Sequence, residues 1–353
     1  MAGLTKCGQG ANGVVYKKNM PGGPVAIKLV DSDDVVKTLR EIYILHLLRD
    51  VVNVVKLMRW YTPPEPSPMY RTHILIVTDF YPKTLFTYLG ECSATPLENE
   101  AVVRMFRELS AVMAHVHARN VVHRDIKGDN ILVAEDGTLV LCDFGLARLI
   151  DDAAPLKLST NIITRYYRPP EVLMRNHYTQ KADVWSMFCV FAEILQKSAP
   201  VVRASVGPVP FYCPLFRGRT SCQSPDGTRE WAPDDQLFVI MRLLGTPRSE
   251  AERMSHHKEL TAQIRDMDPS GNTLAARFPG AEPALLAVLE AGLVFDPTKR
   301  PTAAEVVAMV GGTLEGGVRQ VEPMEMDARM NQLPREALNV DNAELLWSIV
   351  PVM

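Results

Sequence analysis

Short runs of apolar and β-branched residues near the N-terminus predict a small β-sheet. The runs GVVYKK, PVAIKLV and THILIVTD are bounded by Gly, Pro or Asn, which interrupt strands. Between the second and third runs, apolar residues recur at helical spacing from Val35 to Leu48 and leave one polar face. We therefore expect one helix packed on a sheet up to Asp79. A glycine-rich stretch begins so near the N-terminus that we expect only a minimal first strand.

After Tyr81 the pattern becomes helical. The longest amphipathic stretch runs from Glu98 to Ala118, and Thr95, Pro96 and Glu98 resemble a capping box with proline in the first turn. Ser198 to Pro233 is rich in Pro, Gly, Ser and Arg and has no periodicity, which predicts a surface insertion loop. Further helices are expected at Asp183–Gln196, Asp235–Leu244, Pro283–Leu293 and Ala303–Val310. The fold class is α+β, with a β-rich first part and a larger, mainly α second part.

Composition narrows the class of protein. With 353 residues, 47% of them hydrophobic, the chain can bury one large core or two smaller ones. A formal net charge of −3 gives no broad basic field, so we expect no nucleic-acid partner. No run of eighteen apolar residues or N-terminal apolar segment occurs, so we expect no membrane anchor. The six cysteines lack zinc-ligand spacing and indicate reduced thiols in the cytoplasm and/or nucleus.

The words HRDIKGDN and CDFG carry the clearest chemistry. Asp125 can accept a hydroxyl proton, and Lys127 can lie against a transferred phosphate. Asn130 and Asp143 offer the oxygen ligands that Mg²⁺ prefers. Together they predict magnesium-dependent phosphoryl transfer. The alternative is a polar turn with accidental acids, which an eight-residue word followed by DFG at this separation disfavours.

The N-terminal part supplies matching features. Gly8, Gly10 and Gly13 form a GxGxxG that leads into a strand, unlike a dinucleotide-binding fingerprint, which opens a helix. Lys28 lies in an apolar strand, and Glu41 lies on the helix that follows. Taken alone, the glycines could form a chance turn, Lys28 could be an edge lysine, and Glu41 could be an ordinary exposed acid. In this order they predict a Lys28–Glu41 ion pair aimed at the phosphates of ATP.

His123 and Arg124 flank the predicted base. No GxSxG elbow or reactive cysteine accompanies His123, so we interpret it as structural support for the loop. Arg124 is placed to hold a phosphate on another segment, together with Arg40 and Arg148.

These words give the chain a resemblance to the eukaryotic protein kinases from Cys7 to Val310. Lys127 is typical of serine/threonine kinases, and TRYYRPPEVL, PLFRGRT and LVFDPTKRPTAAE resemble the CMGC group. CDFGLAR and TLREI look most like mitogen-activated protein kinases. The resemblance implies a bilobal fold with an N-lobe at 1–79, a C-lobe at 80–310 that contains an insert at about 197–236, and an extension at 311–353. In that family the extension packs back on the small lobe, and Leu333 to Val350 resembles its docking segment.

The resemblance also implies cofactors, partners and roles. ATP and Mg²⁺ would bind, Thr78 would be the gatekeeper and Asp79 to Tyr81 the hinge. Glu171 would pair with Arg300 to brace a substrate platform. Arg165 and Arg168 would favour proline after the phosphoacceptor, so the expected partners are proteins with Ser-Pro or Thr-Pro sites. The residues expected around ATP are Cys7, Gly8, Gly10, Gly13, Val15, Ala26, Lys28, Thr78, Asp79, Tyr81 and Leu132.

Several positions depart from the family pattern. Ser159, Thr160 and Asn161 stand where the family has threonine, any residue and tyrosine. An upstream kinase would then act on Ser159 or Thr160, unless the loop is constitutively ordered. Phe188 stands at a glycine position of a helix, and the sequence names no partner for its ring.

Two alternatives stay open at this point. One is a kinase-fold scaffold without activity, against which the intact set Lys28, Asp125, Asn130 and Asp143 argues. The other is a cyclin-dependent-like kinase that needs a partner subunit. The helix word TLREIYI lacks the pattern typical of cyclin binders, and the long C-terminal tail argues in the same direction.

Overall fold

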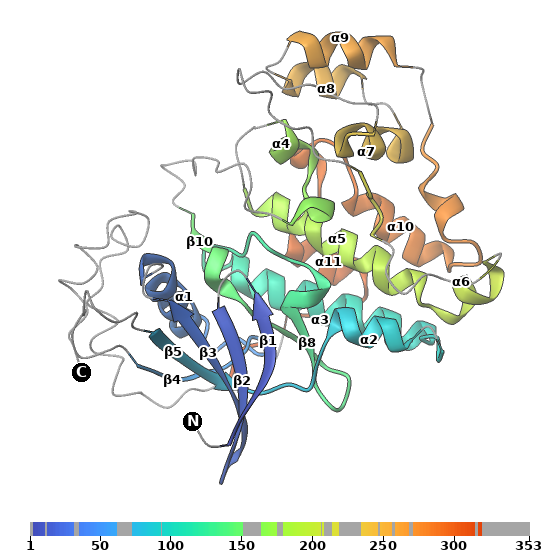
Figure 1. The fold of residues 1–353 in the computed structure, drawn as a ribbon. Helices are drawn as coiled ribbons and strands as arrows, with labels where there is room; N and C mark the ends of the chain where they lie inside the picture. Colours follow the sequence, from blue (N-terminus) through green and yellow to red (C-terminus); the bar gives the residue numbers. More distant parts are fainter. Residues whose placement is uncertain are drawn as a thin grey trace.

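The structure of the chain is a computed structural model. It describes residues 3–10, 13–31, 35–61, 73–92, 94–150, 164–174, 179–205, 207, 214–218, 234–245, 248–255, 258–267, 271–314 and 317–319. Figure 1 shows a β-rich part and a larger helical part, which is the bilobal α+β arrangement of the protein kinase fold.

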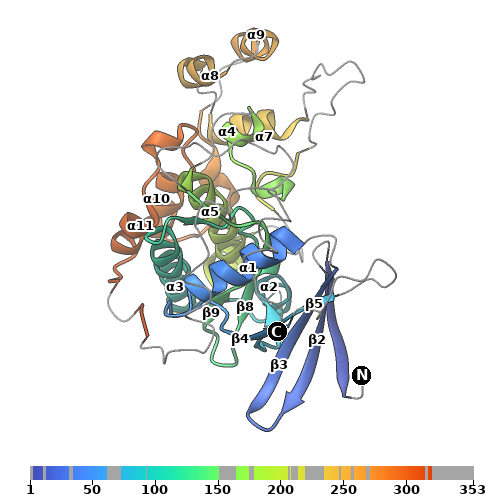
Figure 2. The ribbon, with the colours of Figure 1, turned by 90° about the vertical axis from the view of Figure 1, so that its left-hand side faces the viewer.

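The β-rich part is a five-stranded antiparallel sheet in the order β1-β2-β3-β5-β4. Helix α1 (Val35–Leu47) lies beside it, between the sheet and the helical part (Figures 1 and 2). The strands are β1 (Leu4–Gly10), β2 (Gly13–Met20), β3 (Gly23–Asp31), β4 (Leu57–Tyr61) and β5 (His73–Asp79). The expectation of a minimal first strand is wrong, because β1 is seven residues long and six of them pair with β2. As an edge strand with mostly exposed side chains, it has no apolar spacing that would reveal it.

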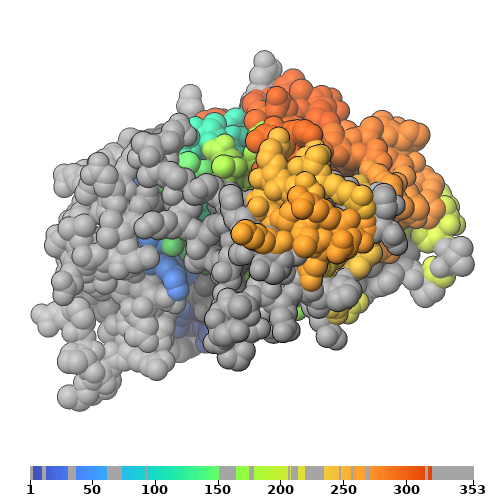
Figure 3. Space-filling model, turned by 90° about the horizontal axis from the view of Figure 1, so that it is seen from above, coloured from blue at the N-terminus to red at the C-terminus, as the bar shows by residue number. Residues whose placement is uncertain are grey.

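The helical part is built around α5 (Gln180–Gln196), whose residues from Ala182 to Leu195 are all buried. Helices α3 and α10 pack against α5, and α11 packs against α3. The other helices are α2 (Leu85–Glu91), α3 (Asn99–His117), α4 (Pro170–Leu173), α6 (Ala199–Ala204), α7 (Gln236–Leu244), α8 (Arg248–Met254), α9 (Lys258–Asp266), α10 (Pro283–Gly292) and α11 (Ala303–Met309). Helices α8 and α9 pack on each other at the end furthest from the sheet, and Figure 3 shows their outer surface in orange.

Short strands and 3-10 turns between β5 and α4 carry the HRDIKGDN and CDFG segments. The strands β6 (Lys83–Thr84), β8 (Ile131–Val133) and β9 (Leu139–Leu141) form one small sheet, and β7 (Val121–Val122) pairs with β10 (Arg148–Leu149). Single 3-10 turns lie at η2 (Gly128–Asn130), η3 (Phe144–Leu146) and η4 (Arg165–Tyr167), and later in the chain at η5 (Leu274–Arg277) and η6 (Pro297–Lys299).

The predicted capping box before α3 is wrong. Glu98 is the N-cap residue and makes no side-chain capping hydrogen bond. The chain is still extended at Leu97, because its N–H donates to the carbonyl of Lys197 at 2.8 Å and its carbonyl accepts from Ala199 N at 2.7 Å. This bridge delays the helix to Asn99. A capping box does occur at α11, where the side chains of Thr302 and Glu305 each accept the other residue's backbone N–H.

The expected surface loop at 198–233 is wrong where the structure describes it. Residues 199–204 form α6, and Leu215 and Phe216 are buried. The Phe216 ring stacks on Trp185 of α5 at a centroid distance of 5.2 Å. The segment has no hydrophobic periodicity, so the spacing of its residues did not predict that its apolar side chains pack into the core.

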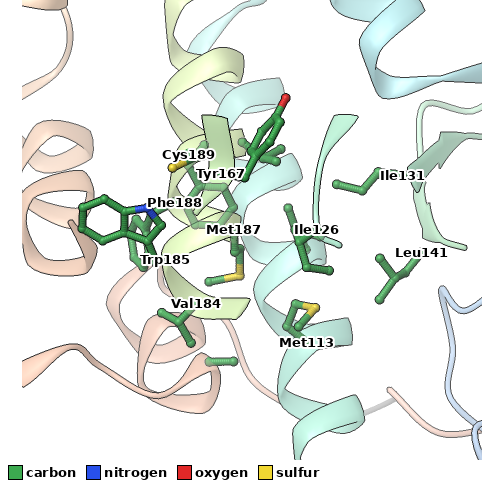
Figure 4. Close-up of a cluster of buried hydrophobic side chains, with 14 of the residues drawn as sticks. Met113, Ile126, Ile131, Leu141, Tyr167, Val184, Trp185, Met187, Phe188 and Cys189 are labelled. Carbon is green, nitrogen blue, oxygen red and sulfur yellow. The ribbon is translucent and has the colours of Figure 1, made fainter. Parts of the chain in front are cut away.

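The structure supplies a packing partner for Phe188. Its ring is fully buried in α5 and meets Phe191 edge to face at 5.1 Å. A Cβ built on Gly292 of α10 would lie 2.0 Å from Phe188 Cδ2, so only glycine fits opposite this ring. Figure 4 shows Phe188 within the buried cluster that includes Trp185, Met187 and Ile126. Gly292 on α10 therefore leaves the space that the Phe188 ring of α5 fills. Phe188 stands where the kinase resemblance implies a glycine.

Candidate active site

Asp125 is the centre of a dense hydrogen-bond network. Its Oδ2 accepts from Lys127 Nζ at 2.6 Å and from Asn130 Nδ2 at 2.8 Å. Its Oδ1 accepts from Thr164 Oγ1 at 2.7 Å, and Thr164 Oγ1 also accepts from Lys127 Nζ at 3.0 Å. The residue is 5% exposed. Donors therefore fix both oxygens of a largely buried carboxylate, as a positioned general base requires. Sequence reasoning gave Thr164 no such role.

Asp183, in the first turn of α5, holds the segment HRDIKGDN (residues 123–130, here the catalytic loop). Its carboxylate accepts the backbone N–H of His123 at 2.7 Å and of Arg124 at 2.9 Å. Burial disfavours the charged carboxylate, but His117 and these N–H groups hold the pKa of Asp183 below its usual range. Arg124 has φ +68°, so these bonds stabilise a strained turn just before Asp125. Sequence reasoning missed this residue, although an acid in the first turn of an otherwise apolar helix was a usable signal.

His123 connects the two motif words, in agreement with its expected structural role. Its Nε2 lies 3.0 Å from the carbonyl oxygen of Cys142, and its ring packs edge to face on Phe144 at 4.7 Å. Ile126 anchors the same loop in the core beside Met113 and Met187 (Figure 4). The His123 side chain therefore helps to hold the catalytic loop against the CDFG segment, where Cys142 N also donates to the carbonyl of Asn130 at 3.0 Å.

Lys28, Glu41 and Asp143 converge between the two parts of the molecule. Lys28 Nζ lies 2.7 Å from Glu41 Oε1 and 3.0 Å from Asp143 Oδ1. Burial alone would lower the pKa of Lys28, but the two carboxylates raise it above its usual range, so the ammonium stays charged. Burial also opposes charge on Asp143, yet Lys28 holds the pKa of that carboxyl down. Asp143 adopts the left-handed conformation (φ +59°, ψ +73°), which turns it toward Lys28.

Asn130 and Asp143 fit the expected metal site by their chemistry. Both Nδ2 bonds of Asn130 go to Asp125, so Oδ1 is the atom left to coordinate a cation. Asp143 supplies a charged oxygen. No group of three or more His, Cys, Asp or Glu that could hold a metal occurs in the part of the chain that the structure describes. A cation held by one carboxylate and one amide needs further oxygens, as Mg²⁺ obtains from bound phosphates.

The glycines of the N-terminal hairpin are not equivalent. Gly13 has φ +127°, and a Cβ there would lie 2.1 Å from the carbonyl oxygen of Leu29, so the turn requires glycine. A Cβ at Gly8 would meet only Val15 at an ordinary 3.8 Å. Cys7 is exposed, and its Sγ donates to the carbonyl of Val15 at 3.4 Å. Gly10 pairs with Gly13 in the β1–β2 ladder.

The expected hinge is held by its own side chains. Asp79 Oδ1 accepts from Lys56 N at 2.7 Å, and its Oδ2 accepts from the Tyr81 hydroxyl at 2.9 Å. Burial and Asp79 together raise the pKa of Tyr81 above its usual range, so the phenol remains a donor. Ala26 pairs directly with Thr78 across β3 and β5, and Leu132 lies on β8. The Asp79 carboxylate is thus held by partners on both of its oxygens, and its backbone N–H donates to the carbonyl of Lys56 at 3.4 Å.

The three arginines expected to bind phosphate gather around η3. Arg124 Nε donates to the carbonyl of Leu146 at 2.7 Å, and Arg148 donates to the carbonyl of Ala147 at 2.9 Å. Arg40 is buried on α1, which packs against η3. Ser159 and Thr160, like the docking segment at 333–350, lie outside the described residues.

The expected substrate platform contains a buried ion pair. Arg300 donates two bonds of 2.7 Å to Glu171, one to each carboxylate oxygen, and its guanidinium lies over Trp185 at 4.9 Å. Such a bidentate pair, buried on both sides, fixes α4 against α5. Arg165 is exposed and Arg168 is half-buried at the edge of this platform.

Glu193 is a buried carboxyl of α5 for which we expect a pH-dependent contribution to stability. Burial raises its pKa to about 8, although the Tyr167 hydroxyl donates to it at 2.8 Å, and Asp129 adds to the rise. Because the folded state holds a proton that the unfolded chain releases near the ordinary glutamate pKa of 4.5, wild-type stability should fall as the pH rises toward and through 8. Glu193→Gln keeps an acceptor for Tyr167 and removes the titration. Relative to wild type, we expect it to gain about 2 kcal/mol between pH 6 and pH 9.

Urea unfolding at several pH values checks this. Glu290→Gln, at an exposed acid of α10, is the matched control and should run parallel to wild type. Parallel curves for Glu193→Gln as well would show that the carboxyl is charged throughout.

Comparisons with known proteins agree with this geometry. A family model described as the protein kinase domain matches residues 2–310. The chain is 31% identical over 318 residues to extracellular signal-regulated kinase 1 of Dictyostelium discoideum, which covers 86% of this chain and 54% of that protein. It is 31% identical over 314 residues to mitogen-activated protein kinase hog1 of Aspergillus niger (86% and 75%). It is also 31% identical over 315 residues to mitogen-activated protein kinase 16 of Oryza sativa subsp. japonica (85% and 56%).

The chain spans about half the length of the Dictyostelium and rice relatives. None of the helices in the described ranges is both long and apolar enough to cross a membrane. The family match covers the sheet, the catalytic loop and the platform together. The chain therefore belongs to the protein kinase family and is a mitogen-activated-protein-kinase-like member of it.

Proposed function

We propose that this chain phosphorylates serine or threonine in protein substrates, with proline after the phosphoacceptor, using ATP and Mg²⁺. The observation that carries the proposal is a pair of side-chain groups: Asp125 with Lys127 and Asn130, and Lys28 with Glu41 and Asp143. Each side chain has the contacts that its expected role requires.

The chain's own residues divide the chemical work. Asp125 accepts the hydroxyl proton, since donors fix its carboxylate in place. Lys127, which touches Asp125 Oδ2, stabilises negative charge on the transferred group. When bound, magnesium-ATP would supply the phosphoryl group, with Asn130 and Asp143 as metal ligands and Lys28 against the phosphates. A scaffold without catalysis is disfavoured because none of these side chains is replaced.

Proline direction rests on the platform and on the family. Glu171 and Arg300 brace the segment that carries Arg165 and Arg168. Three similar proteins bear the names of extracellular signal-regulated or mitogen-activated protein kinases. These observations support a preference for Ser-Pro or Thr-Pro sites.

Matched peptides test the preference. Two peptides should differ only at the residue after the acceptor serine, proline in one and alanine in the other. We expect kcat/KM for the Ser-Pro peptide to be at least about tenfold higher, which corresponds to roughly 1.4 kcal/mol of transition-state discrimination. Equal values would refute proline direction and leave serine/threonine transfer standing.

A further inference from the structure

A turn at residues 48–55, here the linking turn, joins α1 to β4 and is paired on both sides. On one side it meets β9: Val55 N donates to Leu141 O at 2.9 Å, and Leu141 N donates to Asn53 O at 2.8 Å. On the other it meets residues 317–319: Val52 N donates to Gly317 O at 2.9 Å, and Arg319 N donates to Asp50 O at 2.7 Å. Isolated bridges at Val51–Val318 and Val54–Leu141 describe the same pairing.

The two neighbours of this turn carry the carboxylates that contact Lys28. Helix α1 contains Glu41 and ends at Leu47, one residue before the turn. Strand β9 ends at Leu141, two residues before Asp143. A shift of the linking turn would therefore move Glu41 and Asp143 together, away from contacts of 2.7 and 3.0 Å with Lys28.

Arg319 fixes the turn at the end of α1. Its Nε donates to the carbonyl of Arg49 at 2.9 Å, in addition to the backbone bond to Asp50. A cation at carbonyls just beyond a helix C-terminus is favoured by the helix dipole. The Asp50 carboxylate forms an ion pair with Arg119, which also donates to the carbonyl of His115 at 3.0 Å. The turn is thus tied to the end of α3, in the helical part.

Gly317 packs closely against α3 beside the linking turn. A Cβ on Gly317 would lie 1.9 Å from Nε2 of His115 on α3. The segment can reach the linking turn only because residue 317 has no side chain. Val318, between the two, is 50% exposed, so its side chain contributes little to the contact.

We propose that Gly317 and Arg319 are positioning residues for the nucleotide site: through the linking turn they hold α1 and β9 so that Glu41 and Asp143 converge on Lys28. Without them the chain samples states in which the three groups are apart. Bound nucleotide would restore the convergent state, so the loss appears in apparent affinity and not in the rate at saturation. The kinetic readout rests on the proposed function, whereas nucleotide binding does not.

Arg319→Met, which keeps an apolar stem and loses the donor, tests this in the full chain. We expect KM for ATP to rise about tenfold, as it would if the fraction of molecules in the nucleotide-binding state fell to about one tenth. The value of kcat at saturating ATP should stay within about twofold of wild type. The thermal stabilisation by a fixed concentration of magnesium-ATP should shrink in parallel. Arg319→Lys, which retains a cationic donor, should recover part of the affinity.

A second route reaches the same contact without touching Arg319. Gly317→Ala should raise KM for ATP as Arg319→Met does, and adding His115→Ala should reverse most of the rise, because it removes the ring that the new methyl would meet. Val318→Thr, a near-isosteric change at an exposed position, should behave as wild type.

The outcomes separate the two proposals. If Arg319→Met and Gly317→Ala lower the melting temperature but leave KM and the nucleotide shift unchanged, the residues are merely structural and the inference is wrong. A fall in kcat at unchanged KM would also overturn it.

If wild type binds magnesium-ATP but transfers no phosphate, the proposed function fails while the affinity comparison still decides the inference. Absence of any nucleotide shift in wild type would overturn both.

Discussion

Asp125→Asn is expected to lower kcat for peptide phosphorylation by about 10²–10⁴-fold, the range that general base catalysis contributes. An amide cannot accept the hydroxyl proton. Its NH2 group also replaces one of the two accepting oxygens, so either the bonds from Lys127 and Asn130 are lost or the bond from the Thr164 hydroxyl must reverse its direction. Initial rates at saturating magnesium-ATP measure the loss. Magnesium-ATP should still stabilise the variant, because Lys28, Glu41 and Asp143 are unchanged.

Asp136→Asn is the matched control. Asp136 is exposed in the turn between β8 and β9, where it accepts the backbone N–H of Thr138 at 2.9 Å, a bond that asparagine can keep. We expect its kcat within about twofold of wild type, as for surface substitutions away from a site. If Asp125→Asn retained more than about a tenth of wild-type activity, Asp125 would not be the base.

Gly292→Ala is expected to destabilise the folded chain by about 1–3 kcal/mol, because its methyl would collide with the Phe188 ring in a packed core. Phe188→Ala should cost about 3–5 kcal/mol by opening a cavity. The double variant should be much less destabilised than the sum, since the methyl introduced at position 292 would enter space that the ring has left. Denaturant unfolding of wild type, the two single variants and the double variant gives the coupling energy.

Gly271→Ala controls for the change of residue type. A Cβ at Gly271 meets nothing within 4 Å, so this variant should stay within about 0.5 kcal/mol of wild type. Strictly additive effects of Gly292→Ala and Phe188→Ala would show that the two positions do not share one packing site.

Hydrophobic spacing predicted the elements with a buried stripe. The predicted helices at 35–48, 98–118 and 283–293 match α1, α3 and α10 to within one or two residues at each end. It failed for α8 and α9. The side chain of Ala251 is the buried one in α8, and Leu260 and Ile264 are those described as buried in α9. One or two apolar contacts leave too little periodic signal to distinguish a helix from a polar loop.

Some residues of the candidate site could be predicted from the sequence, and others could not. Lys28, Glu41, Asp125, Asn130 and Asp143 could be predicted because short words fix their chemistry locally. The contacts of Asp183 with the catalytic loop span 59 and 60 residues, and Arg319 reaches Arg49 across 270 residues. Glycine is required at position 292 only because the Phe188 ring of another helix packs against it. Such pairings depend on the folded arrangement, so no spacing in one segment encodes them.

Phosphate transfer at this candidate site to protein hydroxyl groups is tested most directly by the wild-type arm of the peptide assay. The purified chain is incubated with a Ser-Pro peptide, ATP labelled in the γ-phosphate and Mg²⁺, and the label on the seryl oxygen is followed by mass spectrometry. We expect transfer that requires Mg²⁺ and that Asp125→Asn reduces by at least about a hundredfold. Magnesium-ATP binding without any transfer to seryl or threonyl peptides would contradict the proposed function.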